Sequence, residues 1–197
     1  RLAQKGFATV CTPVAEWVFY SEYLVDQGLI DQDIPFMDKI RFKIRKKVMA
    51  ADEQRLRTLL NRSGLVNSPP IDVPHIIENA RPYISRHLTG EAVLTIGGSL
   101  SDIASHACGV IAIGPFGCMP NRLSEAIMHE TMCCEKKLTS KPVDRHMKTI
   151  LSQVDDLPFL AVESDGSPFP QIIEAKLEAF CLRAQRMHEL MRGAGVN

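Results

Sequence analysis

Short apolar runs alternate with longer helical segments in the second half of this 197-residue chain, and this alternation constrains the fold most. Residues 109–113 (GVIAI) are wholly apolar, as in a parallel strand that is covered on both faces. Residues 158–162 (PFLAV) form a second run of this kind, and each run leads through a loop into a segment with helical spacing. Strand and helix in alternation predict a parallel sheet with right-handed crossovers, and therefore an α/β fold.

Two further runs complete the predicted sheet. Residues 6–14 (GFATVCTPV) favour a strand that ends at Pro13, because proline cannot donate to a ladder. Residues 92–96 (AVLTI) favour another, followed by a turn at Gly97 and Gly98 into a helix that Ser99 opens, with Asp102 as its capping-box partner. We therefore expect a mostly parallel four-stranded sheet with flanking helices.

Helical spacing of apolar residues is clearest in segments 16–27, 35–60, 74–80 and 171–191. A further helix is expected from Pro120 to about Cys134, after the loop that follows residue 113. We interpret residues 1–197 as one α/β domain in which residues 31–73 form a helical insertion or cap.

Composition excludes several classes of protein. The 23 basic and 23 acidic residues balance, which argues against a dedicated nucleic-acid binder. No apolar run reaches the roughly 18 residues that a membrane span requires. The six cysteines come without an export leader, so we expect free or metal-bound thiols in a reducing cytoplasm. Because the chain opens on Arg1 rather than Met, we also expect it to be a piece of a longer protein.

The candidate site is the edge of the sheet beyond the carboxyl ends of its strands, where open parallel sheets bind ligands. Cys118 follows one predicted strand and precedes a helix N-terminus, which favours a thiolate. Gly117 allows a tight turn beside it, and Cys11 ends the first predicted strand at the same edge. The last strand delivers Glu163 and Asp165. The structural alternative for Cys118 is a small buried hydrophobe inside a tight turn.

The other cysteines give weaker signals. Cys108 precedes its strand at the opposite end, and Cys181 lies on the apolar stripe of the last helix, so both favour burial. Glu125, His129 and Cys133 recur every four residues. Of these, His129 and Cys133 could give two zinc ligands, but there is no CxxC or HExxH motif.

A basic segment stands apart from these sites. Residues 41–47 (RFKIRKK) hold five basic side chains in seven positions. Such a run is usually a solvated helix face. Its functional alternative is a docking patch for an acidic partner or a phosphate-bearing ligand.

Four stretches resemble one family. The strings IGPFGCMPNRLSEAI (113–127) and PFLAVESDGSPFPQIIEAKLEAFCLRA (158–184) resemble the 2-hydroxyacyl-CoA dehydratase activase-related proteins of anaerobic bacteria. HLTGEAVLTIGGSL (87–100) and GFATVCTPVAEW (6–17) are similar to the same family. The resemblance covers most of the chain except about residues 31–73.

The resemblance implies a reductase-like α/β module, similar to dehydratase subunits that hold a [4Fe–4S] cluster through cysteine thiolates. It implies that an actin-like ATPase activase passes an electron to the cluster protein, and that an acyl-CoA thioester is the substrate class. The family's PFGC cysteine matches Cys118, which becomes the first expected cluster ligand, with Cys11 second. Cys133 or Cys134 could complete a set only after local rearrangement. Glu163 and Asp165 would orient donors or tune the redox potential.

The chain departs from such a system because it has no phosphate-binding sequence that would hydrolyse ATP. Either it is the C-terminal part of a fused activase, or the activase is a separate partner. No complete catalytic constellation is present, so we expect a component of a dehydratase or reductase system. Two alternatives stay open: a cluster-free interaction domain that docks the activase, and a zinc-bound structural module. Nucleic acid and membrane are not expected as partners, and homo-oligomer formation is left open.

Overall fold

The computed structural model describes residues 1–30, 36–64, 70–133, 145–166 and 171–193. Its fold class is α/β, with helices and a parallel pair of strands. The chain divides into two compact units. Unit 1 comprises Arg1–Thr9 and His75–Asn197, and unit 2 comprises Val10–Pro74. Helix α3 (Val73–Ala80) runs across this division.

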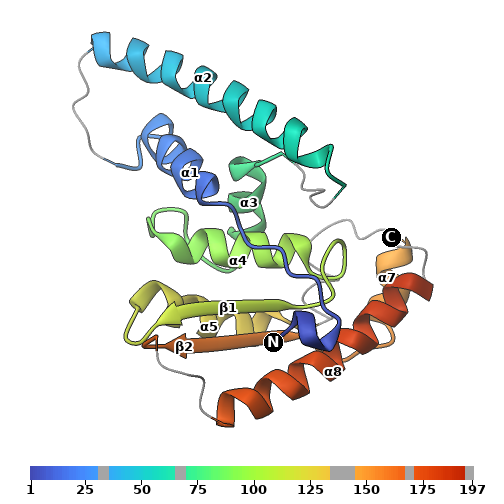
Figure 1. Ribbon diagram of the computed structural model, residues 1–197. Helices are drawn as coiled ribbons and strands as arrows, with labels where there is room; N and C mark the ends of the chain where they lie inside the picture. Colours follow the sequence, from blue (N-terminus) through green and yellow to red (C-terminus); the bar gives the residue numbers. More distant parts are fainter. Residues whose placement is uncertain (31–35, 65–69, 134–144, 167–170, 194–197) are drawn as a thin grey trace. The chain divides into compact units, whose positions relative to one another are not determined.

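The sheet of unit 1 consists of β1 (Val110–Pro115) and β2 (Phe159–Ser164). The two strands are parallel, with Val110 opposite Phe159 and Pro115 opposite Ser164. A parallel pair needs a long crossover, which here contains α5 (Met119–Thr131) and α7 (Arg145–Leu151) (Figure 1). The prediction that the two apolar runs form parallel strands is therefore confirmed.

Helices pack on both faces of this sheet, although the residues of β1 are only partly buried or exposed. Leu160 and Val162 of β2 pack in one core cluster with Phe180 and Ala184 of α8 (Gln171–Gly193). Phe159 meets the ring of His129 on α5 edge-on, at 5.3 Å between ring centroids. Because successive side chains of a strand point to opposite faces, α8 and α5 lie on opposite sides of the sheet. Helix α4 (Glu91–Asp102) packs in turn on α5.

The predicted strand over 92–96 is wrong, because these residues lie inside α4. The buried side of α4 includes Ala92, Val93, Ile96 and Leu100, which is the spacing of a helix face. A short apolar run is equally compatible with a buried helix and with a buried strand, and here the helix forms. Gly97 and Gly98 are consequently helical, and Asp102 ends the helix instead of capping its start.

The predicted strand over 6–14 is also wrong. A short 3-10 helix, η1 (Ala3–Lys5), ends at Gly6 with φ +83°, and residues 7–13 have no regular structure before α1 (Val14–Asp26). Phe7 packs against the core cluster of β2 and α8, but it does so without joining the ladder. The part of the chain that the structure describes thus forms a two-stranded sheet, not the expected four-stranded one.

Unit 2 is helical. The predicted helices at 16–27 and 35–60 are confirmed as α1 and α2 (Phe36–Asn61). Lys46 of α2 forms an ion pair with Asp26 of α1, and Arg45 Nε lies 3.7 Å from Glu22 Oε1. Helix α2 accounts for most of the segment expected as an insertion. No helix in the described ranges is long and apolar enough to cross a membrane.

Candidate functional site

Cys118 lies in the turn between β1 and α5. It is the N-cap residue of α5, with extended backbone angles of φ −69° and ψ 107°, and Pro120 follows in the first turn. Gly117 before it has φ +74°, a left-handed conformation that favours glycine. The Cys118 N–H donates to the Pro115 carbonyl at 3.3 Å. These contacts hold the loop as a tight turn directly beyond the strand.

The thiol of Cys118 is accessible and uncommitted to the helix. Its side chain makes no capping hydrogen bond, and the residue is only partly buried. Its neighbours Phe116 and Met119 are 65% and 78% exposed. Cys118 therefore lies only partly buried, in a loop with exposed neighbours, and its side chain does not cap the helix.

Glu163 lies at the same edge and is tied to α5. In the sheet register it stands opposite Gly114, one residue before the strands end. Its carboxylate is only 11% exposed, and its Oε1 lies 2.7 Å from Arg122 Nε. That oxygen has no well-aligned hydrogen bond in the described part of the chain, so charge attraction holds the pair. Arg122 also reaches Glu125 Oε2 at 3.1 Å.

Arg122 is the residue that the sequence reasoning missed. Its backbone N–H donates to the Cys118 carbonyl at 3.0 Å, which places Arg122 one helical turn beyond the cysteine. The four-residue spacing from Cys118 was visible in the sequence. The pairing with Glu163 was not, because it depends on the parallel register of two strands about fifty residues apart.

A close approach between β1 and α5 also shapes this edge. A Cβ atom on Gly114 would lie 2.5 Å from the Cγ atom of Asn121, so any larger residue would displace that side chain. The Asn121 Nδ2 group is buried and has no hydrogen-bond partner in the described ranges. Glycine at position 114 therefore lets the first turn of α5 lie against the end of the strand.

Asp165 follows β2 in a bend. The next residue, Gly166, has φ +87°, and its N–H donates to Ser164 Oγ at 3.0 Å. Because Pro115 and Ser164 are register partners, the two strands end at the same edge of the sheet. The structure thus brings Gly117, Cys118, Glu163 and Asp165 to one edge.

Cys11 does not reach this edge through the sheet. It is exposed and belongs to unit 2, in the irregular segment before α1. The strand that was expected to carry it to the sheet edge is absent from this segment. The physical reason is that Pro13 and the start of α1 interrupt the run before it can pair.

The remaining described cysteines serve the core or the far end of α5. Burial raises the pKa of the Cys108 thiol. Burial also raises the pKa of Cys181, an effect that Lys5 opposes and Glu178 reinforces. Cys181 lies in the α8 core cluster, as predicted. Cys133 lies beyond the end of α5, so the expected stripe with His129 stops short of it. Cys134 lies outside the described residues.

The fit to an iron–sulfur cluster is incomplete. A cluster takes four cysteines, or three and one exchangeable ligand. In the ranges that the structure describes, no three His, Cys, Asp or Glu side chains come together in a way that could hold a metal ion. The same finding leaves the zinc alternative without a ligand set there. These residues therefore supply one well-placed thiol, Cys118, and not a complete set.

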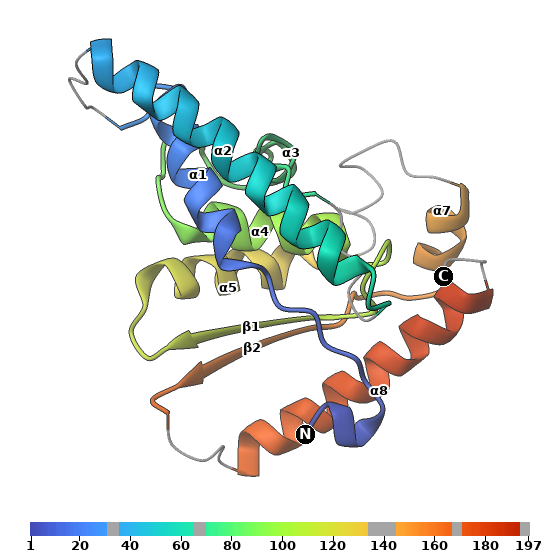
Figure 2. The ribbon, with the colours of Figure 1, turned by 45° about the horizontal axis from the view of Figure 1, so that its top comes forward.

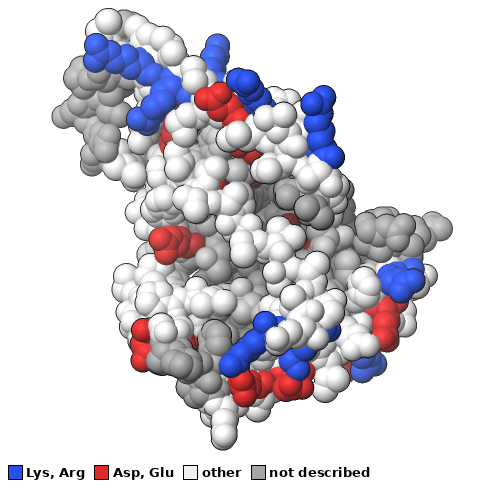
Figure 3. Space-filling view, in the orientation of Figure 1, with Lys and Arg blue, Asp and Glu red and all other residues white. Residues whose placement is uncertain are grey.

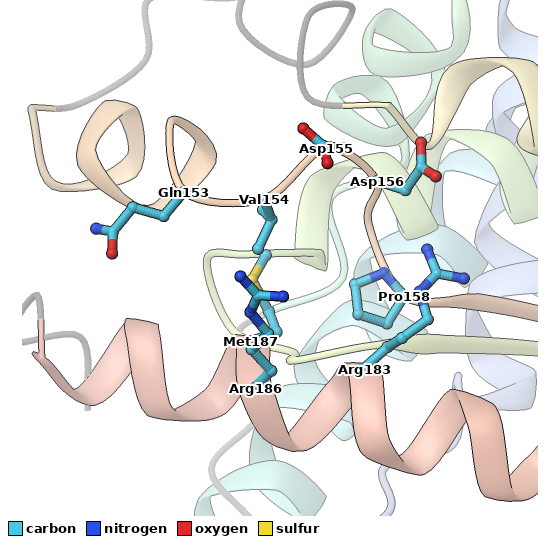
Figure 4. Close-up of a pocket in the computed structure, with 8 residues that line it drawn as sticks. All are labelled: Gln153, Val154, Asp155, Asp156, Pro158, Arg183, Arg186 and Met187. Carbon is cyan, nitrogen blue, oxygen red and sulfur yellow. The ribbon is translucent and has the colours of Figure 1, made fainter.

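A hollow of about 210 Å³ lies at the opposite end of the sheet (Figure 4). Its lining contains two arginines and two aspartates: Asp155, Asp156, Arg183 and Arg186. Arg183 Nη2 donates to the Leu157 carbonyl at 3.1 Å, so this side chain links α8 to the residues just before β2. The hollow and the loop of Cys118 do not coincide. We place the candidate site at the carboxyl edge, because that edge carries the thiol and is where parallel sheets bind ligands.

No protein-family model matches this chain, and no curated protein or solved structure matches it. The functional assignment therefore rests on the geometry of the carboxyl edge and on the sequence resemblance.

Proposed function

We propose that Cys118 is a thiolate ligand of a [4Fe–4S] cluster, in the electron-transfer module of an ATP-driven CoA-ester reductase or dehydratase system. The observation that carries this proposal is the position of Cys118. It caps α5 directly beyond a parallel strand, in an open glycine turn, and its sulfur makes no capping bond. Cysteine thiolates are the ordinary ligands of such clusters.

The surroundings of Cys118 suit a negatively charged ligand set. The first turn of a helix has N–H groups without intrahelical partners, and these favour negative charge. Arg122 adds a cation one turn away, held in place by Glu163 and Glu125. We assign Glu163 the role of positioning Arg122. Charges and hydrogen bonds around the sulfur ligands are what tune such sites.

The other ligands must come from elsewhere than the described group around Cys118. Cys11 is the second proposed ligand, and a partner subunit, or Cys133 or Cys134 after local rearrangement, could supply the rest. The partner class, an actin-like ATPase activase, and the substrate class, an acyl-CoA thioester, follow from the resemblance alone.

Anaerobic reconstitution with iron and sulfide tests this proposal. We expect a band at about 400 nm, where cysteine-ligated clusters absorb. The band should disappear in Cys118→Ala, weaken in Cys11→Ala and persist in Cys108→Ala, which serves as the matched control because Cys108 precedes β1 at the opposite end of the sheet. A wild-type protein that stays colourless, or a band indifferent to Cys118→Ala, would refute the assignment.

A cluster-free docking domain is the second candidate. Exposed apolar side chains lie within five residues of Cys118 in the sequence: Ile113 and Phe116 are both 65% exposed, and Met119 is 78% exposed. Surfaces of this kind often contact other proteins. This candidate predicts binding of the activase that survives Cys118→Ala and fails in Phe116→Ser, with no reconstituted absorbance in either protein.

A further inference from the structure

Helix α2 has two long stripes of different character. The first is the partly buried one, which recurs at spacings of three and four residues and comprises Phe42, Lys46, Met49, Glu53 and Arg57. It holds the ion pair from Lys46 to Asp26 of α1 and the pair between Arg57 and Glu53. This side of α2 is mixed in charge and is already engaged within unit 2.

The second stripe is apolar and exposed. Met37, Ile40, Ile44 and Val48 are 62%, 41%, 59% and 54% exposed. Their spacing of three, four and four residues places them along one side of a helix that turns about 100° per residue. That side lies nearly opposite the partly buried stripe. The apolar stripe is therefore the uncovered side of α2, and at 1.5 Å per residue it runs for about 17 Å.

Basic residues border the apolar stripe on both sides. Lys43 and Lys47 lie along one flank, and Arg41 and Arg45 along the other, and all four are exposed. Residues 41–47 contain no acidic side chain. Figure 3 shows Lys and Arg side chains gathered over α2, and Figure 2 shows the length of this helix. A partner must therefore offer apolar side chains with negative charge beside them.

We propose that the apolar stripe of α2 docks an acidic amphipathic helix of another protein. The stripe is one helix wide, and Ile40, Ile44 and Val48 are β-branched residues at the spacing of a helix-packing seam. Acidic residues on one flank of the partner would meet Lys43 and Lys47, whereas on the other border Arg45 already pairs with Glu22. Charge complementarity of this kind directs association and selects the partner.

Two other occupants fit the apolar stripe less well. A second copy paired antiparallel through this stripe would place the basic segment 41–47 against itself, which like-charge repulsion opposes. The basic borders would suit an anionic lipid surface, but the apolar side is a poorer match, because interfacial helices present Trp, Phe and Leu there. Here the stripe is aliphatic, and Phe42 belongs to the opposite, partly buried stripe.

A synthetic acidic peptide tests the proposal on the full chain. The probe is a three-heptad helix with Leu and Ile in its seam and Glu on both flanks, followed by fluorescence anisotropy. We expect saturable binding in the micromolar range that weakens as salt is added. Ile44→Ser should weaken it about tenfold, as expected for one buried aliphatic side chain. Lys43→Glu with Lys47→Glu should weaken it further.

Matched controls separate docking from general charge effects. Lys148→Glu with Lys176→Glu reverses two exposed lysines elsewhere, on α7 and α8, and should leave binding unchanged. Circular dichroism should show the same helix content in every variant. The assay needs no metal, so its result is independent of the cluster proposed at Cys118.

Three results would overturn the proposal. The first is no saturable binding of the peptide, or equal binding by wild type and Ile44→Ser. The second is Ile44-dependent binding to phosphatidylserine vesicles without peptide binding, which would make α2 a lipid-surface helix. The third is an Ile44-dependent dimer in sedimentation, which would make the stripe a contact between copies of this chain.

Discussion

Helices α2 and α8 are comparable in length, at 26 and 23 residues, but the apolar side is buried in α8 and exposed in α2. In α8, Phe180, Ala184, Met187 and Met191 are buried. In α2 the most apolar side is the exposed one, and the partly buried side carries Lys46, Glu53 and Arg57 instead. The same periodicity thus marks a core helix in one unit and an open helix face in the other.

The difference teaches what hydrophobic periodicity can and cannot establish. Apolar residues three or four apart indicate a helix and identify one of its sides. They do not identify the surface that covers that side. For α8 the cover is Leu160 and Val162 of β2, which the parallel sheet brings beneath it. For α2 we propose that the cover is a partner.

The largest expected effect comes from truncating one side chain on each helix. Phe180→Ala should destabilise the protein by about 3–5 kcal/mol, because the loss of the ring leaves a cavity between α8 and β2. Ile44→Ala on the exposed side of α2 should change stability by no more than about 0.5 kcal/mol. Guanidinium unfolding of both variants measures the contrast. Similar losses in the two variants would mean that the stripe of α2 is covered within the folded chain.

Helix α4 offers the same contrast on adjacent residues. A Cβ at Gly97 would lie 2.0 Å from the Ile76 carbonyl oxygen, a backbone atom that cannot move alone. Gly97→Ala should therefore cost about 1–3 kcal/mol. Gly98 has open space around it, so Gly98→Ala should stabilise the helix by about 0.5–1 kcal/mol. Thermal unfolding should show shifts of opposite sign, and two shifts of the same sign would contradict this packing of α4.

Ion pairs give a smaller effect that again depends on cover. Glu163→Gln should cost about 1 kcal/mol, because it removes the charge with which the mostly buried Glu163 side chain pairs with Arg122. Glu78→Gln is the matched control, since its pair with Arg81 joins two well-exposed side chains. That substitution should be close to neutral. Equal losses in the free energy of unfolding by urea would show that burial of Glu163 does not strengthen its ion pair.

The smallest effect is a pH dependence. Burial raises the pKa values of Cys108 and Cys181, so the folded state holds these protons more tightly than the unfolded chain does. Their contribution to stability is complete below the ordinary thiol pKa of about 8.5 and is lost as pH rises above it. Unfolding at neutral and alkaline pH should show this decline, and it should be flatter in Cys108→Ala with Cys181→Ala. A decline of stability with pH that is equally steep in the wild type and in the double variant would contradict this prediction.

Much of the carboxyl edge could be predicted from the sequence. The runs at 109–113 and 158–162 are apolar on both faces, so their pairing in a parallel sheet followed directly. That pairing brings Cys118, Glu163 and Asp165 to one edge without further information. The helices α1, α2, α3, α5 and α8 were also predictable, because their spacing is regular.

What could not be predicted depends on contacts between distant residues. The run at 92–96 is short and apolar, and only the spacing of the buried residues Ala92, Val93, Ile96 and Leu100 reveals a helix. Gly97 resembled a turn residue, although its role is the close approach to Ile76. Cys11 was assigned to the edge through a strand that does not form. The position of Arg122 beside Glu163 required the register of the sheet.

Electron paramagnetic resonance of the reconstituted, dithionite-reduced protein tests the central claim most directly. Cysteine-held clusters carry an unpaired spin on one-electron reduction, which loosely bound iron does not reproduce. We predict a cluster signal in the wild type that Cys118→Ser shifts or abolishes and that Cys108→Ser leaves unchanged. A wild type without this signal, or a signal identical in Cys118→Ser, would contradict the assignment of Cys118 as a cluster ligand.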